Sequence, residues 1–117
     1  MQYALAEFMK DSSTYINLAS FYQEKHELLY NGLLKTKFKP IRSDGTFFLL
    51  ANYSDISKQS EYDFVTELTK KHKVGLIPVS AFYKDSTSEE ANNYLVRFCF
   101  AKYDATLNEA INRLIAI

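Results

Sequence analysis

The feature that most constrains this chain is an arginine set inside an otherwise apolar run, Tyr94-Leu95-Val96-Arg97-Phe98-Cys99-Phe100-Ala101. The residue types of the run favour a β-strand, and a polar linker before it and a helical pattern after it limit it to strand length. A buried guanidinium must find an anion, because an unpaired buried charge carries a large desolvation cost. The run contains no acidic residue. Arg97 therefore pairs with a carboxylate elsewhere in the fold, or it binds a carboxylate that arrives as a ligand.

Composition narrows the classes of protein to which the chain can belong. Its 117 residues are enough for one domain with a real core, and 47% hydrophobic with 24% charged residues is typical of a globular protein. The 14 Lys and Arg residues balance the 14 Asp and Glu residues, so neither nucleic acid nor a membrane surface is a predicted partner. The single cysteine, Cys99, excludes an intrachain disulfide and suits a reducing compartment, so the predicted location is the cytoplasm. No membrane span or signal peptide is predicted either.

Hydrophobic spacing predicts helices and strands in alternation. Turn and capping residues place their ends: Ser43-Asp44-Gly45 is predicted to be a tight hairpin turn, and Ser60, followed by Asp63, is predicted to cap a helix. Pro78 interrupts one strand, which is therefore expected at a sheet edge. The predicted helices are 2–10, 14–36, 60–73 and 104–115, and the predicted strands are 38–42, 46–52, 74–79 and 94–101.

Details of these elements carry further expectations. The basic residues Lys70–Lys73 are interpreted as a helix end, where cations complement the helix dipole. Residues 84–93 form the only strongly polar linker and are expected to be a mobile loop. Asp104 is predicted to cap the last helix, whose apolar stripe consists of Leu107, Ile111, Leu114 and Ile115.

The sequence contains few motifs for catalysis, metal binding or phosphate binding. No second histidine or cysteine stands at metal-ligand spacing from His26 or His72, so no metal site is predicted. Cys99 is interpreted as a buried, inert thiol. No phosphate-binding loop, dinucleotide fingerprint or nucleophile elbow is present. The acidic residues of the third predicted helix and its approach are expected to form a solvated face: Asp55, Glu61, Asp63 and Glu67.

Three segments, taken together, resemble a known family. They are Gly45-Thr46-Phe47-Phe48-Leu49-Leu50, then 74–83 (VGLIPVSAFY), then 94–102 (YLVRFCFAK), in this order and at this spacing. They resemble the C-terminal third of class I/II pyridoxal-phosphate-dependent aminotransferases, and the kynurenine and methionine aminotransferase-like subgroup in particular. The opening residues 2–6 and the tail 104–114 fit the same pattern, so the resemblance covers nearly the whole chain.

The resemblance implies a fold and a site. It implies one α+β domain over residues 1–117, with a small mixed or antiparallel sheet and helices packed mainly on one face. It also implies that Arg97 binds the α-carboxylate of an amino-acid substrate, a role that suits a planar guanidinium on a rigid strand. Gly45 resembles a glycine whose backbone approaches the substrate, although a need for glycine in the turn explains it equally well. Phe82 and Tyr83 resemble aromatic residues at the rim of the substrate site, and core or edge packing is the alternative.

The resemblance also implies what this chain lacks. The family's Schiff-base lysine, the other ligands of pyridoxal 5′-phosphate and most of the substrate pocket belong to a large domain whose motifs do not occur here. No catalytic, cofactor-binding or metal-binding residue is therefore predicted, and the chain alone is expected to be inactive. Its predicted partners are that large domain, a second subunit of a homodimer, and the amino-acid and 2-oxo-acid substrates of the parent enzyme.

Two alternatives of a different class stay open. The chain could be a free-standing module that binds or senses amino acids or 2-oxo acids without chemistry, since Arg97 would serve that purpose as well. It could also be a purely structural interaction domain, in which case Arg97 should be paired with an acidic side chain of its own fold.

Overall fold

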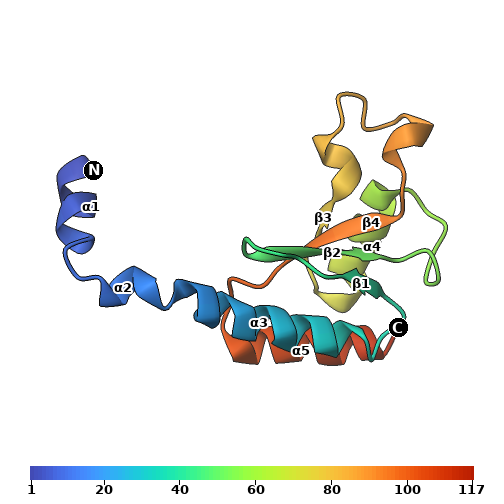
Figure 1. Ribbon diagram of the computed structural model, residues 1–117. Coiled ribbons are helices and arrows are strands. Elements are labelled where there is room, and N and C mark those ends of the chain that lie inside the picture. Colours follow the sequence, from blue (N-terminus) through green and yellow to red (C-terminus); the bar gives the residue numbers. More distant parts are fainter.

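A computed structural model describes all residues, 1–117, and gives a small antiparallel sheet with helices on one side (Figure 1). This confirms the α+β prediction. Along the chain the elements are α1 (Gln2–Phe8), α2 (Ser13–Ile16), α3 (Leu18–Leu33), β1 (Lys39–Ile41), β2 (Phe48–Asn52), α4 (Glu61–His72), β3 (Ile77–Pro78), the 3-10 turns η1 (Val79–Phe82) and η2 (Glu89–Ala91), β4 (Leu95–Cys99) and α5 (Asp104–Ile115).

The sheet has the order β1-β2-β4-β3, and every pairing in it is antiparallel. The strand that carries Arg97 is therefore central, and Arg97 lies between Leu50 on β2 and Ile77 on β3. β3 lies at the edge, as predicted, but it is shorter than expected because the chain turns into η1 directly after Pro78.

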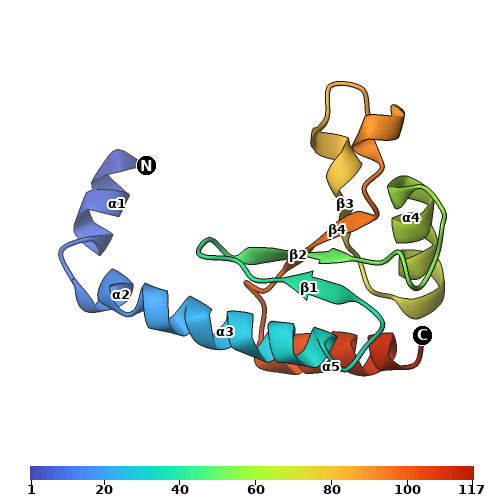
Figure 2. The same cartoon turned by 45° about the vertical axis from the view of Figure 1, so that its right-hand side comes forward.

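The two faces of the sheet differ because side chains alternate along each strand. One face, called the covered face below, is buried against the helices and consists of Leu49, Ala51, Val96 and Phe98. Helices α3, α4 and α5 all add side chains to that core, and α3 and α5 lie side by side beneath the sheet (Figures 1 and 2). The opposite face, called the open face, carries Phe48, Leu50, Arg97 and Cys99.

The contact between α3 and α5 is close at Gly32. A Cβ added there would clash with the side chain of Ile111, so glycine lets the two helices approach this closely. On α5 the buried stripe consists of Leu107, Ile111 and Leu114. Ile115, which was predicted to belong to the stripe, is exposed.

The N-terminal segment projects away from this core (Figure 1). No residue of α1 or α2 is buried, and the long helix predicted over 14–36 is interrupted at Asn17. Without packing, helix propensity alone does not hold a long continuous helix. Every helix of the chain is too short or too polar to cross a membrane.

The ends of α4 agree with the sequence. Ser60 is its N-cap and accepts a hydrogen bond from the Asp63 N–H at 3.2 Å. The helix ends at Lys73, which has a left-handed backbone (φ 58°), and Lys70, Lys71 and His72 occupy the last turn. The interpretation of the basic cluster as a helix end is confirmed.

Two local predictions are wrong. The N-cap of α5 is Tyr103, and Asp104 is instead the first helical residue, paired with Lys25 at 2.7 Å. The predicted tight hairpin turn is a longer loop, because Arg42 and Ser43 bond to Glu27 and His26 of helix α3. The polar linker 84–93 is a loop, as predicted, and contains the short turn η2, whose Ala91 is fully buried.

Candidate functional site

Arg97 occupies the middle of the open face, half-buried between two aromatic rings. Its Cζ atom lies 4.6 Å from the ring centroid of Phe48 on β2 and 4.9 Å from that of Phe82 in η1. These cation–π contacts hold the guanidinium at the open face without using its N–H groups as hydrogen-bond donors. Phe82 is itself 61% exposed, so this aromatic clamp stands at the surface.

No carboxylate of the chain pairs with Arg97. The seven ion pairs of the structure involve other residues, and the Arg97 side chain makes no hydrogen bond within the chain. By contrast, Arg42 pairs with Glu27 at 2.7 Å, and Arg113 bonds to Glu109 and to the backbone oxygen of Lys73. Arg97 is thus the one arginine whose donors are left for a partner from outside. This observation is contrary to the hypothesis of a structural domain with an internally paired Arg97.

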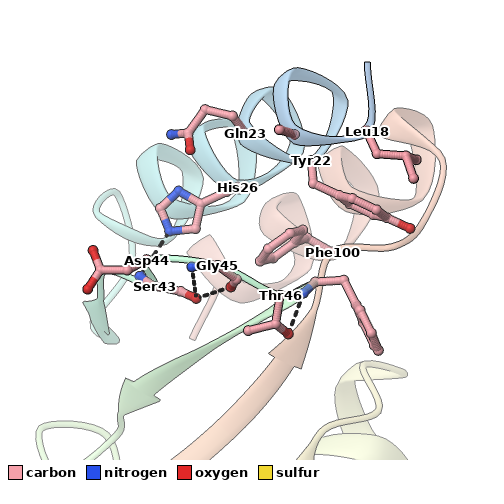
Figure 3. A pocket seen from close by; sticks show the side chains of 11 residues that line it. Leu18, Tyr22, Gln23, His26, Ser43, Asp44, Gly45, Thr46 and Phe100 are labelled. Atoms are coloured by element: carbon pink, nitrogen blue, oxygen red, sulfur yellow. Dashed lines mark hydrogen bonds between the residues drawn. The ribbon is translucent and has the colours of Figure 1, made fainter. Parts of the chain in front are cut away.

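Gly45 lies in a different place from Arg97. It lines a cavity of about 460 Å³ between α3 and the loop 42–47, together with residues such as His26 and Phe100, and Arg97 is not part of that lining (Figure 3). The turn explanation for Gly45 is wrong, because its φ is negative and the neighbouring Thr46 carries the positive φ of 65°. A Cβ at Gly45 would meet nothing within 4 Å, so its surroundings are open.

His26 anchors this loop, a role that the sequence did not indicate. The side chain is only 4% exposed, and its Nε2 accepts a hydrogen bond from the Ser43 N–H at 3.2 Å (Figure 3). The Ser43 hydroxyl in turn donates to the Gly45 oxygen at 2.5 Å. An aromatic environment supports the imidazole, since Phe100 meets it edge-on at 5.6 Å. The loop that carries Gly45 is therefore tied to helix α3.

Glu61 contradicts the prediction of a solvated acidic face. It is the first residue of α4 and is only 1% exposed, while Asp63 and Glu67 of the same helix are exposed or half-buried. Its carboxylate accepts hydrogen bonds from the backbone N–H groups of Ser80, Asn93 and Leu95. An acidic residue in the first turn of a helix is typical of solvent-exposed positions, so no local pattern indicates that this one is buried.

The Glu61 charge affects a neighbouring tyrosine. Tyr53 is fully buried, stacks on Phe64 with ring centroids 3.9 Å apart, and donates its hydroxyl to the Gln59 oxygen at 2.9 Å. Burial, and to a smaller extent the nearby Glu61 carboxylate, raise the pKa of Tyr53 well above its usual value. Tyr53 therefore stays neutral at physiological pH and serves the core.

Cys99 is also placed differently from the prediction. It was expected to be buried, but it is exposed on the open face, opposite Phe48. The expectation failed because it assumed that both faces of the central strand are covered. Of the two aromatic residues assigned to the rim, Phe82 contacts Arg97, and Tyr83 accepts a hydrogen bond from the Asn93 amide at 3.3 Å.

The residues of this chain do not form a site for pyridoxal 5′-phosphate. Covalent attachment of that cofactor needs a free lysine amino group, and the lysine that the register places with Arg97 on the open face is Lys39. Its amino group is engaged by Asp55 at 2.7 Å, and this contact lowers the pKa of the Asp55 carboxyl. The other lysines that form ion pairs are Lys10, which follows α1, Lys25 on α3 and Lys71 on α4.

Comparison with known proteins gives a consistent result. Residues 1–114 match the family model described as aminotransferase class I and II. A methionine aminotransferase from Escherichia coli is 36% identical over 97% of this chain, and kynurenine–oxoglutarate transaminase 3 from Rattus norvegicus is 38% identical over 94% of it. The chain spans only 28% of the length of each of these relatives.

Solved structures agree with the sequence relatives. An Escherichia coli structure, described as identifying a methionine aminotransferase function, superposes with a TM-score of 0.87 at 35% identity and covers 97% of this chain. The N-succinyldiaminopimelate aminotransferase from Mycobacterium tuberculosis gives 0.81 at 34% identity over the same share. This chain covers 29% and 28% of those structures, respectively.

Proposed function

We propose that this chain, which belongs to the aminotransferase class I and II family, is the C-terminal small domain of a pyridoxal-phosphate-dependent aminotransferase. In the parent enzyme, Arg97 binds the α-carboxylate of the amino-acid substrate and of the 2-oxo acid. The observation that carries this proposal is the Arg97 guanidinium, which is held between Phe48 and Phe82 and has no acidic partner in its own fold.

The geometry favours a carboxylate over other anions. A guanidinium presents its N–H donors in one plane and in a fixed fork that matches the two oxygens of a carboxylate. Contacts with the two aromatic rings and the rigid central strand hold the Arg97 side chain in place before a ligand binds. Binding therefore requires little reorganisation of the side chain, which lowers its entropic cost.

Gly45 is a second and weaker candidate for substrate contact. Nothing of this chain lies within 4 Å of the position that a Cβ would occupy, so a ligand or another domain could approach its backbone closely. In this proposal the loop that His26 anchors presents the Gly45 backbone, while Arg97 holds the carboxylate from the sheet.

The remaining parts of the enzyme come from outside this chain. Pyridoxal 5′-phosphate, bound by the large domain, supplies the electron sink for moving the amino group. We further propose a homodimer in the cytoplasm, with the chain alone inactive. The named relatives support an amino acid as donor and a 2-oxo acid as acceptor.

The first test is to read the genomic sequence on the 5′ side of the Met1 codon. A continuous frame of several hundred codons with a Schiff-base lysine motif supports the proposal, whereas a stop codon and a ribosome-binding site directly upstream contradict it. The longer protein would then be produced and assayed for amino-group transfer.

In that longer protein, Arg97→Ala should weaken amino-acid binding by about 2–5 kcal/mol, the usual cost of removing one partner of a buried charge pair. Arg97→Lys should recover little, because the charge returns without the planar fork. Arg42→Lys is the matched control, since Arg42 is exposed and already paired with Glu27. Unchanged steady-state kinetics in both Arg97 variants would contradict the proposal that Arg97 binds the substrate carboxylate.

The second candidate function is the free-standing sensor of amino acids or 2-oxo acids, which the unpaired state of Arg97 in this chain also favours. Titration calorimetry of the 117-residue chain separates the two. A sensor binds amino acids or 2-oxo acids in isolation, whereas a domain that lacks most of its pocket binds them poorly.

A further inference from the structure

Glu61 is a nearly fully buried carboxylate whose two oxygens both accept hydrogen bonds from the backbone. Its Oε2 accepts a hydrogen bond from the Ser80 N–H at 2.5 Å, and its Oε1 accepts from the Asn93 N–H at 3.1 Å and the Leu95 N–H at 2.9 Å. The donors come from two segments that are distant from Glu61 in sequence. Both oxygens are used, and the group is almost entirely shielded from solvent.

These bonds reach η1, which carries Phe82, and the start of β4, which carries Arg97. Ser80 lies in η1, two residues before Phe82, and Leu95 begins β4, two residues before Arg97. Phe82 and Arg97 are in contact across the gap between these elements, 4.9 Å from Cζ to the ring centroid. The Glu61 carboxylate therefore holds the backbone of both segments, the one that carries Phe82 and the one that carries Arg97. We propose that Glu61 is a positioning residue that sets the orientation of Arg97 for carboxylate recognition.

The backbone between the two donors to Oε1 supports this role. Tyr94 lies between Asn93 and Leu95 and has a left-handed conformation with φ of 57°, which is disfavoured for a bulky side chain. The N–H groups on both sides of it converge on the same oxygen, so Glu61 holds the conformation that directs the chain into β4. The Tyr53 N–H adds a bond to the Tyr94 oxygen at 3.0 Å.

The role requires a carboxylate, because an ionised carboxylate has only acceptors to offer. A glutamine of the same shape would keep one acceptor oxygen and would turn an NH₂ group toward backbone N–H donors. The bonds to Ser80 and to the Asn93–Leu95 pair cannot then both persist, so one side of the clamp should be released.

This inference rests on the proposed function, but its test needs no substrate. The chain contains three arginines, so the side-chain Nε–Hε signals of Arg42, Arg97 and Arg113 can be assigned individually in the ¹⁵N-labelled 117-residue chain. Stacking against Phe48 and Phe82 should shift the Arg97 Hε signal upfield through ring currents. Arg42, which stacks on Tyr30 at 4.3 Å, provides an internal reference.

We expect Glu61→Gln to remove much of the upfield shift of Arg97 Hε, with the Arg42 signal and the far-ultraviolet circular dichroism unchanged. Glu67→Gln is the matched control, because it removes the same charge from the exposed side of the same helix, where Glu67 pairs with Lys71. This control should leave Arg97 Hε in place.

A folded Glu61→Gln chain with an unmoved Arg97 signal would overturn the inference. If that variant does not fold, Glu61→Asp is measured instead, and it should move the signal in the same direction because its shorter side chain cannot reach both segments. Loss of the folded state in both variants would assign Glu61 to stability alone and would also overturn the inference. If the signal moves as expected but Arg97→Lys leaves amino-acid kinetics unchanged in the longer enzyme, the proposed function fails while the effect of Glu61 on Arg97 stands.

Discussion

The two faces of the same small sheet differ in how far helices of this chain bury them. On the covered face, Leu49, Ala51, Val96 and Phe98 are all buried by helices of this chain. On the open face, Phe48, Leu50 and Arg97 are only half-buried and Cys99 is exposed. The chain thus completes one face by itself and leaves the other, with its charged arginine, for contact with something else.

The two buried or half-buried charges next to this sheet differ in the same way. The Glu61 carboxylate is fully bonded by backbone N–H groups, whereas the Arg97 guanidinium has aromatic neighbours and no anion. Buried charges are expensive unless they are paired, so the bonded Glu61 charge stabilises the fold, and the unpaired Arg97 charge supports the proposal that this arginine binds a carboxylate. Stability measurements on matched variants of the two faces test this difference.

The largest expected effect is on the covered face. Phe98→Ala should lower the free energy of unfolding by about 3–5 kcal/mol, because it opens a cavity in a core where Phe98 meets Phe38 edge-on at 5.4 Å. Phe48→Ala makes the same chemical change on the open face. It should cost about half as much or less, since part of the Phe48 ring is already in water. Urea denaturation of both variants provides the measurement, and equal losses would contradict the distinction between the faces.

The central part of this arrangement could be predicted from the sequence. The β4 segment, the position of Arg97 within it and the capping of α4 by Ser60 all follow from local patterns of apolar, charged and capping residues. The three segments of resemblance also predicted the family correctly. These features depend on residues near one another in the chain, where periodicity and capping carry the information.

The features that the sequence missed depend on contacts between distant segments. In the sequence, Glu61 resembles any acidic residue at the start of a helix. Its burial depends on hydrogen bonds from Ser80 and Leu95, which lie 19 and 34 residues further along the chain. The hairpin loop is longer than its Asp-Gly pair suggests because His26 binds Ser43. Cys99 was assigned to a buried strand because a strand pattern does not show which of its faces remains uncovered.

An intermediate effect is expected at Arg97 itself. In the 117-residue chain, Arg97→Leu should change the free energy of unfolding by about 1 kcal/mol or less, because it removes two partly exposed cation–π contacts and no ion pair. Leucine also keeps apolar contact with Phe48 and Phe82. A loss of 3 kcal/mol or more would reveal an anionic partner within the chain and would remove the contrast with Glu61.

The smallest effect on stability is expected at Cys99. This thiol lies at the end of β4 on the open face, so a thiol reagent such as dithionitrobenzoate should label it in the folded chain at nearly the rate measured in denaturant. Cys99→Ser should change the free energy of unfolding by no more than about 0.5 kcal/mol, as is usual for exposed sites. Labelling that occurs only after unfolding would show that Cys99 is shielded from solvent in the folded chain, and would contradict an exposed open face. If the face is instead covered by the large domain of a longer enzyme, the same reagent should label Cys99 more slowly in that enzyme. A difference in rate between the short and the long protein would then measure directly how far the open face is completed from outside.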